Sequence, residues 1–208
     1  FFFRSSSVMF RIAGLTTSVA CLRTLVRPRF HGTADTGVLE YLLKVEKDGE
    51  EYYRNLAERA SNPGFKYIFT MLADEEAKHY HAIEQLQASG DLSLEKSTIL
   101  GETRNTFEQL KADPKAKITA TTGQLELYLE ARAIEARNRD EYIKRAQLAT
   151  DPKVKALFQL VANEEQKHFV MIDELIQFIG KAEPGRGSWT ESAEFNRLDD
   201  ALYDNYKY

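Results

Sequence analysis

Two Glu-x-x-His motifs are the residues of this chain best suited to chemistry, and each follows a lone glutamate 30 residues upstream. Four carboxylates can neutralise and bridge two divalent metal ions, while neutral imidazoles suit Fe(II). One glutamate from each of two helices and one Glu-x-x-His from each of two others form a dimetal site in four-helix bundles. We therefore expect two iron ions here, although manganese fits the same ligands. The expected ligands are Glu46, Glu76, His79, Glu135, Glu165 and His168.

The two ligand sets are parts of an internal repeat with an offset of 89 residues and no gap. Between residues 46–86 and residues 135–175, 14 of 41 positions are identical. A single Glu-x-x-His on a helix mostly marks a solvated face, but two matched copies with matched upstream glutamates are hard to explain by chance. Val45 and Ile134 directly precede the lone glutamates, and an uncoordinated charge buried beside them would be costly. Metal coordination would offset that cost.

Residues beside the ligands form a second group of candidates. Tyr53 and Tyr142 each lie two helical turns after a lone glutamate, where a phenol can hydrogen-bond a ligand carboxylate and orient it. The alternative is that both are core aromatics with a satisfied hydroxyl. Glu75 and Glu164 directly precede the ligand glutamates of the two motifs. Either they accept the outer N–H of the opposite hairpin's histidine, or they are solvent-facing or helix-pairing charges.

The spacing of apolar residues predicts long helices that position these side chains. The first helical hairpin begins near Thr36, turns at residues 61–64, where Pro and Gly break the helix, and closes at Gly90. The second consists of residues 124–149 and 152–180, with an aspartate N-cap and a proline at the first position of its second helix.

Between the hairpins, residues 91–123 form a connection that includes a short helix around residues 102–112. A connection this long is uncommon unless it has a task, and here it crosses the length of the bundle. The predicted fold is all-α, a four-helix bundle of two hairpins joined by a long crossover, over residues 36–181. Residues 182–208 are interpreted as an extended arm that packs on the bundle or on a neighbour, as in a homodimer.

Charge is distributed unevenly along the chain. Residues 1–30 contain five arginines and no Asp, Glu or Lys, and removing them takes the formal net charge from −4 to −9. An acidic body suits cation binding and argues against a nucleic-acid partner. The single cysteine, Cys21, lies in the basic segment, so the body contains no disulfide, zinc finger or Cys₄ iron site.

The basic start is rich in Arg, Ser and Thr, which predicts an organellar transit peptide over residues 1–35, with translation starting at Met9. The expected destination is the mitochondrial matrix, with a plastid as the alternative. A short disordered basic tail is the competing interpretation. Arg11 and Arg23 leave too short an apolar run between them for a transmembrane helix.

The motifs resemble the rubrerythrin branch of the ferritin-like superfamily. Residues 46–53 (Glu-Lys-Asp-Gly-Glu-Glu-Tyr-Tyr) and 73–79 (Ala-Asp-Glu-Glu-Ala-Lys-His) are similar to the first hairpin of that branch. Residues 162–168 (Ala-Asn-Glu-Glu-Gln-Lys-His) are similar to its second hairpin. The resemblance covers about residues 38–180 and implies a ferritin-like fold. The likeness of the two halves is nearest to the internally symmetric symerythrin type.

Two departures from the branch bear on function. The chain lacks the four cysteines of the rubredoxin module that passes electrons in a full rubrerythrin. Rubrerythrins also carry an extra metal-binding glutamate about a turn beyond the third-helix ligand, where this sequence has Asn138, and Gly49 at the matching position of the first hairpin. Glu50 is the nearest candidate for an additional ligand.

The resemblance implies a non-haem diiron oxidase or peroxidase that reduces hydrogen peroxide or O₂ with electrons from an external donor. The same six ligands also serve a ferroxidase or iron-handling protein, in which the metal is the substrate. A third alternative is an organellar structural or assembly subunit with a structural dimetal centre. Hydroxylase and desaturase roles rank lower, because nothing in the sequence resembles a long substrate channel or a membrane-docking face.

Overall fold

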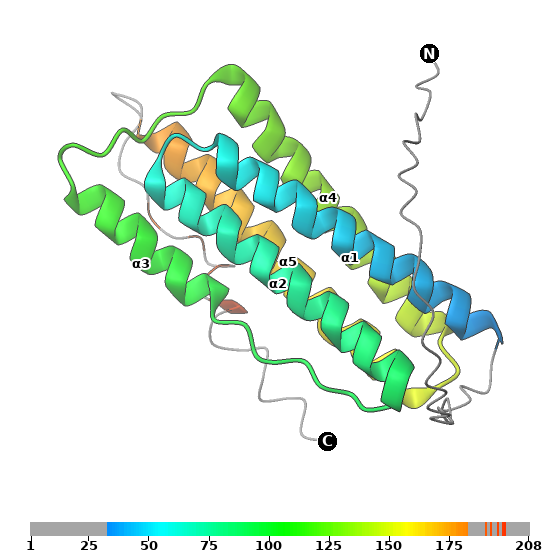
Figure 1. Ribbon diagram of the computed structural model, residues 1–208. Helices are drawn as coiled ribbons and strands as arrows, with labels where there is room; N and C mark the ends of the chain where they lie inside the picture. Colours follow the sequence, from blue (N-terminus) through cyan, green and yellow to red (C-terminus); the bar gives the residue numbers. More distant parts are fainter. Residues whose placement is uncertain (1–32, 183–189, 191, 193–194, 196, 199–208) are drawn as a thin grey trace, which may run out of the picture.

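The computed structural model describes residues 33–182 together with residues 190, 192, 195, 197 and 198. This part of the chain is all-helical and contains no strand. Most of the expected transit peptide, including Met9 and Cys21, lies outside the described residues. None of the helices within them has the length and apolar character needed to cross a membrane. The helices are α1 (Thr33–Arg59), α2 (Pro63–Ser89), α3 (Ile99–Ala112), α4 (Thr122–Leu148) and α5 (Pro152–Lys181) (Figure 1).

Two long hairpins, α1–α2 and α4–α5, form the body of the bundle (Figure 1). Each hairpin turns at a proline in the first helical position, where a missing N–H removes no intrahelical hydrogen bond. Asn62 caps α2 by accepting hydrogen bonds from two backbone N–H groups, and Asp151 caps α5 in the same way. Gly90 ends α2 with a φ of 75°, a left-handed conformation that favours glycine. These residue types therefore fix where the helices begin and end.

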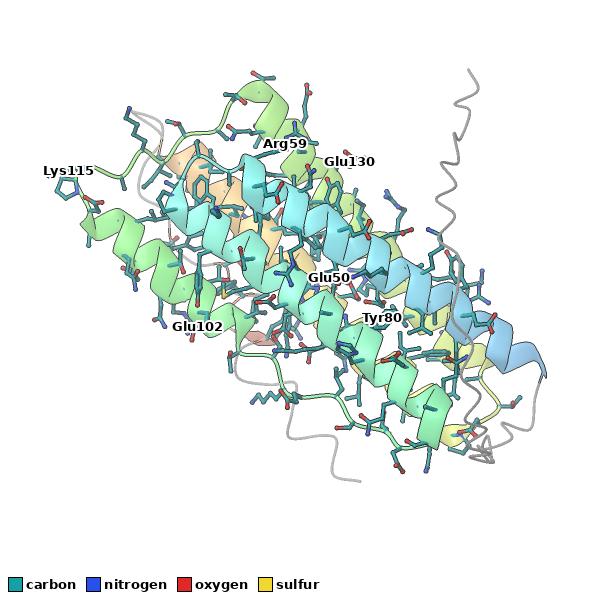
Figure 2. The ribbon with its side chains drawn as sticks, viewed as in Figure 1. Glu50, Arg59, Tyr80, Glu102, Lys115 and Glu130 are labelled. Atoms are coloured by element: carbon teal, nitrogen blue, oxygen red, sulfur yellow. The ribbon has the colours of Figure 1, made fainter. Side chains whose placement is uncertain are left out.

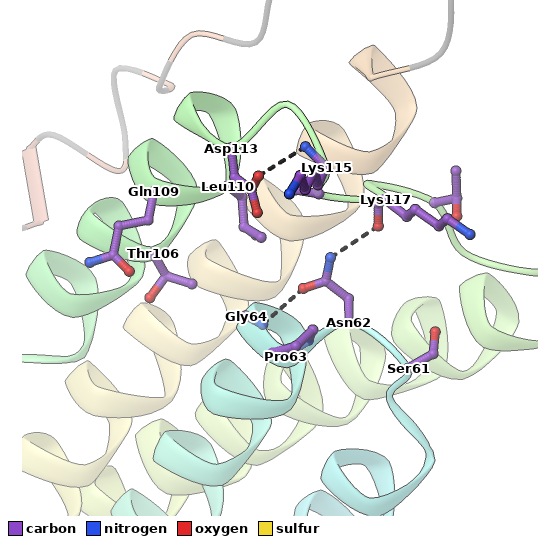
Figure 3. Close-up of a pocket in the computed structure, with 12 residues that line it drawn as sticks. Ser61, Asn62, Pro63, Gly64, Thr106, Gln109, Leu110, Asp113, Lys115 and Lys117 are labelled. Atoms are coloured by element: carbon purple, nitrogen blue, oxygen red, sulfur yellow. Dashed lines mark hydrogen bonds between the residues drawn. The ribbon is translucent and has the colours of Figure 1, made fainter.

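The chain between the hairpins runs along the bundle and includes α3 (Figure 1). α3 packs on α2 and α5, and the ring of Phe107 stacks on Phe178 with centroids 4.5 Å apart. The side-chain amide of Asn62 donates to the carbonyl of Lys117 at 3.0 Å, which ties the α1–α2 turn to the crossover (Figure 3). A pocket of about 570 Å³ lies beside this contact. A capping box at Thr121 then starts α4.

Two hydrophobic clusters fill the interior of the described bundle. One contains Phe69 and Phe107, and the other contains Ile83 and Phe158. On each of α1, α2, α4 and α5, buried Glu or His residues lie in sequence between members of the two clusters; they are Glu46, Glu76, His79, Glu135, Glu165 and His168. Apolar side chains therefore enclose the polar residues from both directions along the helices.

The C-terminal segment packs on the bundle at the positions that the structure describes. Phe195 and Leu198 are buried in the same hydrophobic cluster as Phe107. The backbone N–H of Ser192 donates to the buried carboxylate of Glu174 at 2.9 Å. At these positions the expected arm contacts its own bundle.

Candidate metal centre

The six side chains that the sequence singled out lie together in the interior of the bundle. α1 and α4 each supply one glutamate. α2 and α5 each supply a Glu-x-x-His pair, because residues three apart project from one face of a helix. None of the six side chains is more than 1% exposed. They are Glu46, Glu76, His79, Glu135, Glu165 and His168.

These residues form two overlapping groups of four, and in each group one oxygen or nitrogen atom from every residue lies within 4.8 Å of the others. Glu76 and Glu165 belong to both groups, so each of these carboxylates is placed to bridge two metal positions. Each group thus offers three carboxylates and one imidazole. The first group is completed by Glu46 and His79, and the second by Glu135 and His168.

The Nδ1 atoms of the two histidines face the carboxylates. His79 Nδ1 lies 3.3 Å from an oxygen of Glu46 and 3.3 Å from an oxygen of Glu165. His168 Nδ1 lies 3.2 Å from an oxygen of Glu76. The two rings stack with their centroids 5.3 Å apart. Nδ1 is therefore the nitrogen that is positioned to bind a metal ion.

Tyr53 and Tyr142 connect the two hairpins through the lone glutamates. The hydroxyl of Tyr53 on α1 donates to Oε1 of Glu135 on α4, and the hydroxyl of Tyr142 on α4 donates to Oε1 of Glu46 on α1. No Cα atom of α1 lies within 8 Å of one in α4, so these long side chains span the space between the helices. Each phenol holds one carboxylate oxygen and leaves the other, Oε2, without a hydrogen-bond partner.

The cluster concentrates buried polar groups whose hydrogen-bonding capacity is unmet, which is costly in a protein interior. Each of the six residues has at least one buried oxygen or nitrogen without a hydrogen-bond partner. Burial raises the pKa of Glu76 to about 8 and the pKa of Glu135 to about 7. Burial and the neighbouring Glu135 carboxylate raise the pKa of Glu165 as well. Two divalent cations would neutralise the carboxylates and use the unpaired atoms, so this donor set fits a dimetal centre.

Glu75 and Glu164 do not form the hydrogen bonds to histidine that the sequence suggested. Nε2 of both ligand histidines is buried without a hydrogen-bond partner. Glu75 pairs with Lys78 at 2.7 Å, and Glu164 pairs with Lys167 at 3.0 Å, each one turn along its own helix. Burial raises the pKa of Glu75, but the hydrogen bond from Lys78 and the charge of His168 lower it overall. Both glutamates therefore pair along their own helices.

Glu50, the candidate for an additional ligand, does not belong to either group of the cluster. Its side chain lies along the line where α1 and α2 meet (Figure 2). The carboxylate is 2.8 Å from the ammonium of Lys47 and 3.3 Å from the guanidinium of Arg54. These two cations, Lys47 first, hold the pKa of Glu50 below its usual value despite some burial.

Lys167 is a buried residue next to the ligands that the sequence analysis did not single out. Its side chain is buried together with its partner Glu164, directly before the ligand His168. The signal in the sequence was its repeat mate Lys78, because both motifs read Glu-Glu-x-Lys-His. A buried ion pair beside the ligands fixes the helix face that presents them.

The arrangement agrees with comparison to known proteins. The Rubrerythrin family model matches residues 37–176, which include all six residues of the cluster and more than half of the chain. No curated protein and no solved structure matches this chain. Proteins of the matched family bind a diiron centre, and the buried Glu and His cluster of this chain is able to hold metal ions. The chain belongs to the rubrerythrin family.

Proposed function

We propose that this protein is a diiron oxidoreductase that reduces hydrogen peroxide or O₂ with electrons from an external donor. The observation that carries the proposal is the buried cluster of four glutamates and two histidines in a chain of the rubrerythrin family. The proposed ligands are the six cluster residues, with two iron ions as the cofactor.

The reaction balances without an organic cofactor. Hydrogen peroxide takes up two electrons and two protons, its O–O bond breaks, and two water molecules form. Two bound Fe(II) ions, held by the six cluster residues, would supply these two electrons, and the external donor would reduce them again. The lack of four cysteines after Cys21 means that a rubredoxin-type module within this chain is not that donor.

The protein's own residues hold the ligands in place and exclude bulk water. Tyr53 and Tyr142 orient the glutamates of the opposite hairpin through their hydroxyl groups. On α1, Leu42 is buried one turn before Glu46, and Leu39 is buried two turns before it. Tyr128 and Ala131 are buried at the same spacing before Glu135 on α4. These apolar walls favour retention of the metal through repeated redox cycles over its release.

Metal content tests the ligand assignment. After anaerobic loading with Fe(II) and desalting, the wild-type protein is expected to retain two iron ions per chain, and Glu135→Ala is expected to retain fewer. Glu130→Ala is the matched control, since Glu130 is exposed on the same helix (Figure 2). Two retained ions in Glu135→Ala would remove Glu135 from the site.

The oxidant and the fate of the iron separate the proposed function from iron handling. Stopped-flow absorbance of the Fe(II)-loaded protein is expected to show faster oxidation by hydrogen peroxide than by O₂. Both irons are expected to stay bound through several cycles of oxidation and chemical reduction. Transfer of iron to a chelator or to a mineral after one turnover would instead establish a ferroxidase, with iron as the substrate. If both irons stay bound but are oxidised slowly by hydrogen peroxide and by O₂, the metal centre would be structural.

We also propose that residues 1–35 direct the protein to the mitochondrial matrix, on the strength of their arginine content and their almost complete lack of acidic residues. Fusion of these residues to a fluorescent protein tests the proposal. Diffuse cytosolic fluorescence would contradict it, and plastid fluorescence would support the alternative organelle.

A further inference from the structure

Tyr53, whose hydroxyl donates to the ligand Glu135, is in ring contact with a second tyrosine. The rings of Tyr52 and Tyr53 meet edge to face, with their centroids 5.6 Å apart and an angle of 75° between the ring planes. Tyr53 is fully buried, whereas Tyr52 is only partly buried. The pair therefore connects a ligand of the metal centre to the surface of the bundle through two aromatic rings.

Contacts with α4 hold both rings of the pair in place. The hydroxyl of Tyr52 donates to the backbone carbonyl of Leu127 at 3.1 Å, and the hydroxyl of Tyr53 donates to Oε1 of Glu135. Burial and the charge of Glu130 raise the pKa of Tyr52 to about 12, so its phenol keeps its proton at neutral pH. Two protonated phenols are thus fixed side by side, one at the site and one at the surface.

The second hairpin has no such pair among the residues that the structure describes. The repeat mate of Tyr52 is Glu141, and the ring of Tyr142 contacts Phe158 instead, with centroids 5.9 Å apart. Phe158 is buried, and a phenyl ring is much harder to oxidise than a phenol. A path of oxidisable rings from a ligand to the surface is therefore a feature of α1, although both hairpins carry the tyrosine that holds a ligand.

The proposed reaction gives such a path a task. Hydrogen peroxide takes up two electrons, but a donor that delivers single electrons leaves the centre with one Fe(II) between two deliveries. In that state the centre can supply only one of the two electrons. The second must then come from an oxidisable group close to the metal, and the phenol of Tyr53 is hydrogen-bonded to a ligand.

We propose that Tyr53 supplies this missing electron and that Tyr52 replaces it from the surface, an inference that rests on the proposed function for the oxidant. One hydrogen peroxide, one Fe(II), the phenol of Tyr53 and one proton from solvent give two water molecules, one Fe(III) and the neutral Tyr53 radical. Tyr52 then gives an electron and a proton to Tyr53, which becomes a phenol again. The external donor returns one electron to Tyr52, and solvent returns one proton.

The test uses centres that can supply only one electron. Each protein is loaded with one equivalent of Fe(II) and one of Zn(II), which cannot be oxidised, and its content of both metals is measured. It is then mixed with hydrogen peroxide, frozen and examined for a tyrosyl radical by electron paramagnetic resonance. In parallel samples a nitroso spin trap marks the residue that carries the radical, and mass spectrometry of peptides locates it. The variants are Tyr52→Phe and Tyr53→Phe, with Tyr67→Phe, at an exposed position on α2, as the control.

The wild type and Tyr67→Phe are expected to give a radical that is trapped at Tyr52 and disappears quickly when ascorbate is added. Tyr53→Phe is expected to lower the yield of trapped Tyr52 several-fold, because the first electron then has no source beside the ligand. Tyr52→Phe is expected to keep the radical on Tyr53, where ascorbate removes it several-fold more slowly because the ring is buried. An equal yield of trapped Tyr52 in Tyr53→Phe and the wild type would overturn the inference.

The two proposals fail in different ways. Rapid oxidation of the protein with two Fe(II) ions, but no tyrosyl radical in the Fe(II)/Zn(II) protein, would overturn the inference and leave the proposed function standing. If hydrogen peroxide oxidises neither form, both are overturned. If Tyr53→Phe binds less metal, Tyr52→Phe decides, because Tyr52 donates to the backbone of Leu127 and not to a ligand. A radical that ascorbate removes from Tyr52→Phe at the wild-type rate would then overturn the inference.

Discussion

At the scale of single residues, each lone glutamate accepts a hydrogen bond from a tyrosine on the opposite hairpin. Tyr142 supports Glu46, and Tyr53 supports Glu135, across the space between α1 and α4. Their environments nevertheless differ. Burial raises the pKa of Glu46, but the neighbouring imidazole of His79, 3.3 Å away, and the hydroxyl of Tyr142 lower it overall, whereas burial raises the pKa of Glu135 to about 7. In the metal-free protein, Glu46 is therefore held closer to its charged form than Glu135.

Replacing either tyrosine by phenylalanine removes its hydroxyl and tests how much the hydrogen bond to the glutamate stabilises the protein. Tyr142→Phe is expected to destabilise the metal-free protein by about 1–3 kcal/mol, because a buried carboxylate oxygen loses its only hydrogen bond. Tyr53→Phe is expected to cost less, because Glu135 is more easily protonated. Urea unfolding followed by circular dichroism measures both. Tyr67→Phe, at an exposed position on α2, is the control. Unfolding midpoints equal to that of the control would contradict the assigned role.

The shifted pKa values also predict a dependence of stability on pH. A carboxyl whose pKa is raised on folding stabilises the folded state at low pH, and this contribution is lost as pH rises through the folded pKa. For Glu76 and Glu135 the loss extends up to about pH 8 and about pH 7. The Tm of the metal-free protein is therefore expected to fall between about pH 4.5, the ordinary carboxyl pKa, and about pH 8.

Metal binding should reverse this trend, since ligands must be deprotonated before they coordinate. The difference in Tm between Co(II)-loaded and metal-free protein is expected to widen over the same pH interval. Differential scanning calorimetry of both forms measures it, with Glu76→Gln as the variant that lacks one titrating ligand. A metal-free Tm that rises with pH would contradict the burial argument.

At the scale of helices, local residue types determined most of what could be predicted. Proline, the capping residues and Gly90 placed the ends of α2 and α5 within about two residues. The start of α3 was harder, since the helix begins at Ile99, three residues before the expected Glu102. Ile99 and Leu100 are buried against the bundle, and that packing depends on segments distant in sequence.

The spacing of the ligands was likewise readable, because residues three apart share a helix face. The hydrogen bonds between the tyrosines of one hairpin and the glutamates of the other could not be predicted from the sequence. Sequence spacing gives no information on which tyrosine meets which glutamate, since that depends on how far apart α1 and α4 lie. The position of Glu50 outside the cluster, partly buried at its edge, was missed for a related reason. One turn from Glu46 it shares roughly the same face, but its ion pairs with Lys47 and Arg54 hold it at the edge.

The two hairpin turns offer a matched test of capping. Asn62→Ala and Asp151→Ala each remove a side chain that accepts two backbone hydrogen bonds, which should cost about 1 kcal/mol. Asn62→Ala is expected to cost more, because Asn62 also donates to the carbonyl of Lys117 in the crossover. Chemical denaturation of both variants measures the difference. Equal losses would mean that the contact with the crossover adds no stability.

At the scale of the whole molecule, the C-terminal segment completes the core. Phe195 is fully buried with Phe107 and Phe178, between α3 and α5, and Arg104 lies over its ring. Phe195→Ala is therefore expected to destabilise the protein by about 3–5 kcal/mol. Thr190→Ala, at an exposed position of the same segment, is the control.

Thermal unfolding measures the loss, and iron content after loading at low temperature shows whether the site is affected. The iron content of Phe195→Ala is expected to equal that of the wild type, since this hydrophobic cluster contains no ligand. Loss of iron without loss of stability would show that the tail supports the site directly.

The composition of the two metal positions has a consequence for how the protein matures. Each position takes three of its four ligand residues from one hairpin and the fourth from the other, through the shared Glu76 and Glu165. A newly synthesised chain with one hairpin formed therefore offers no complete position. Tight metal binding must follow the docking of the hairpins, so unfinished chains are kept from binding metal ions before the surrounding apolar side chains are in place.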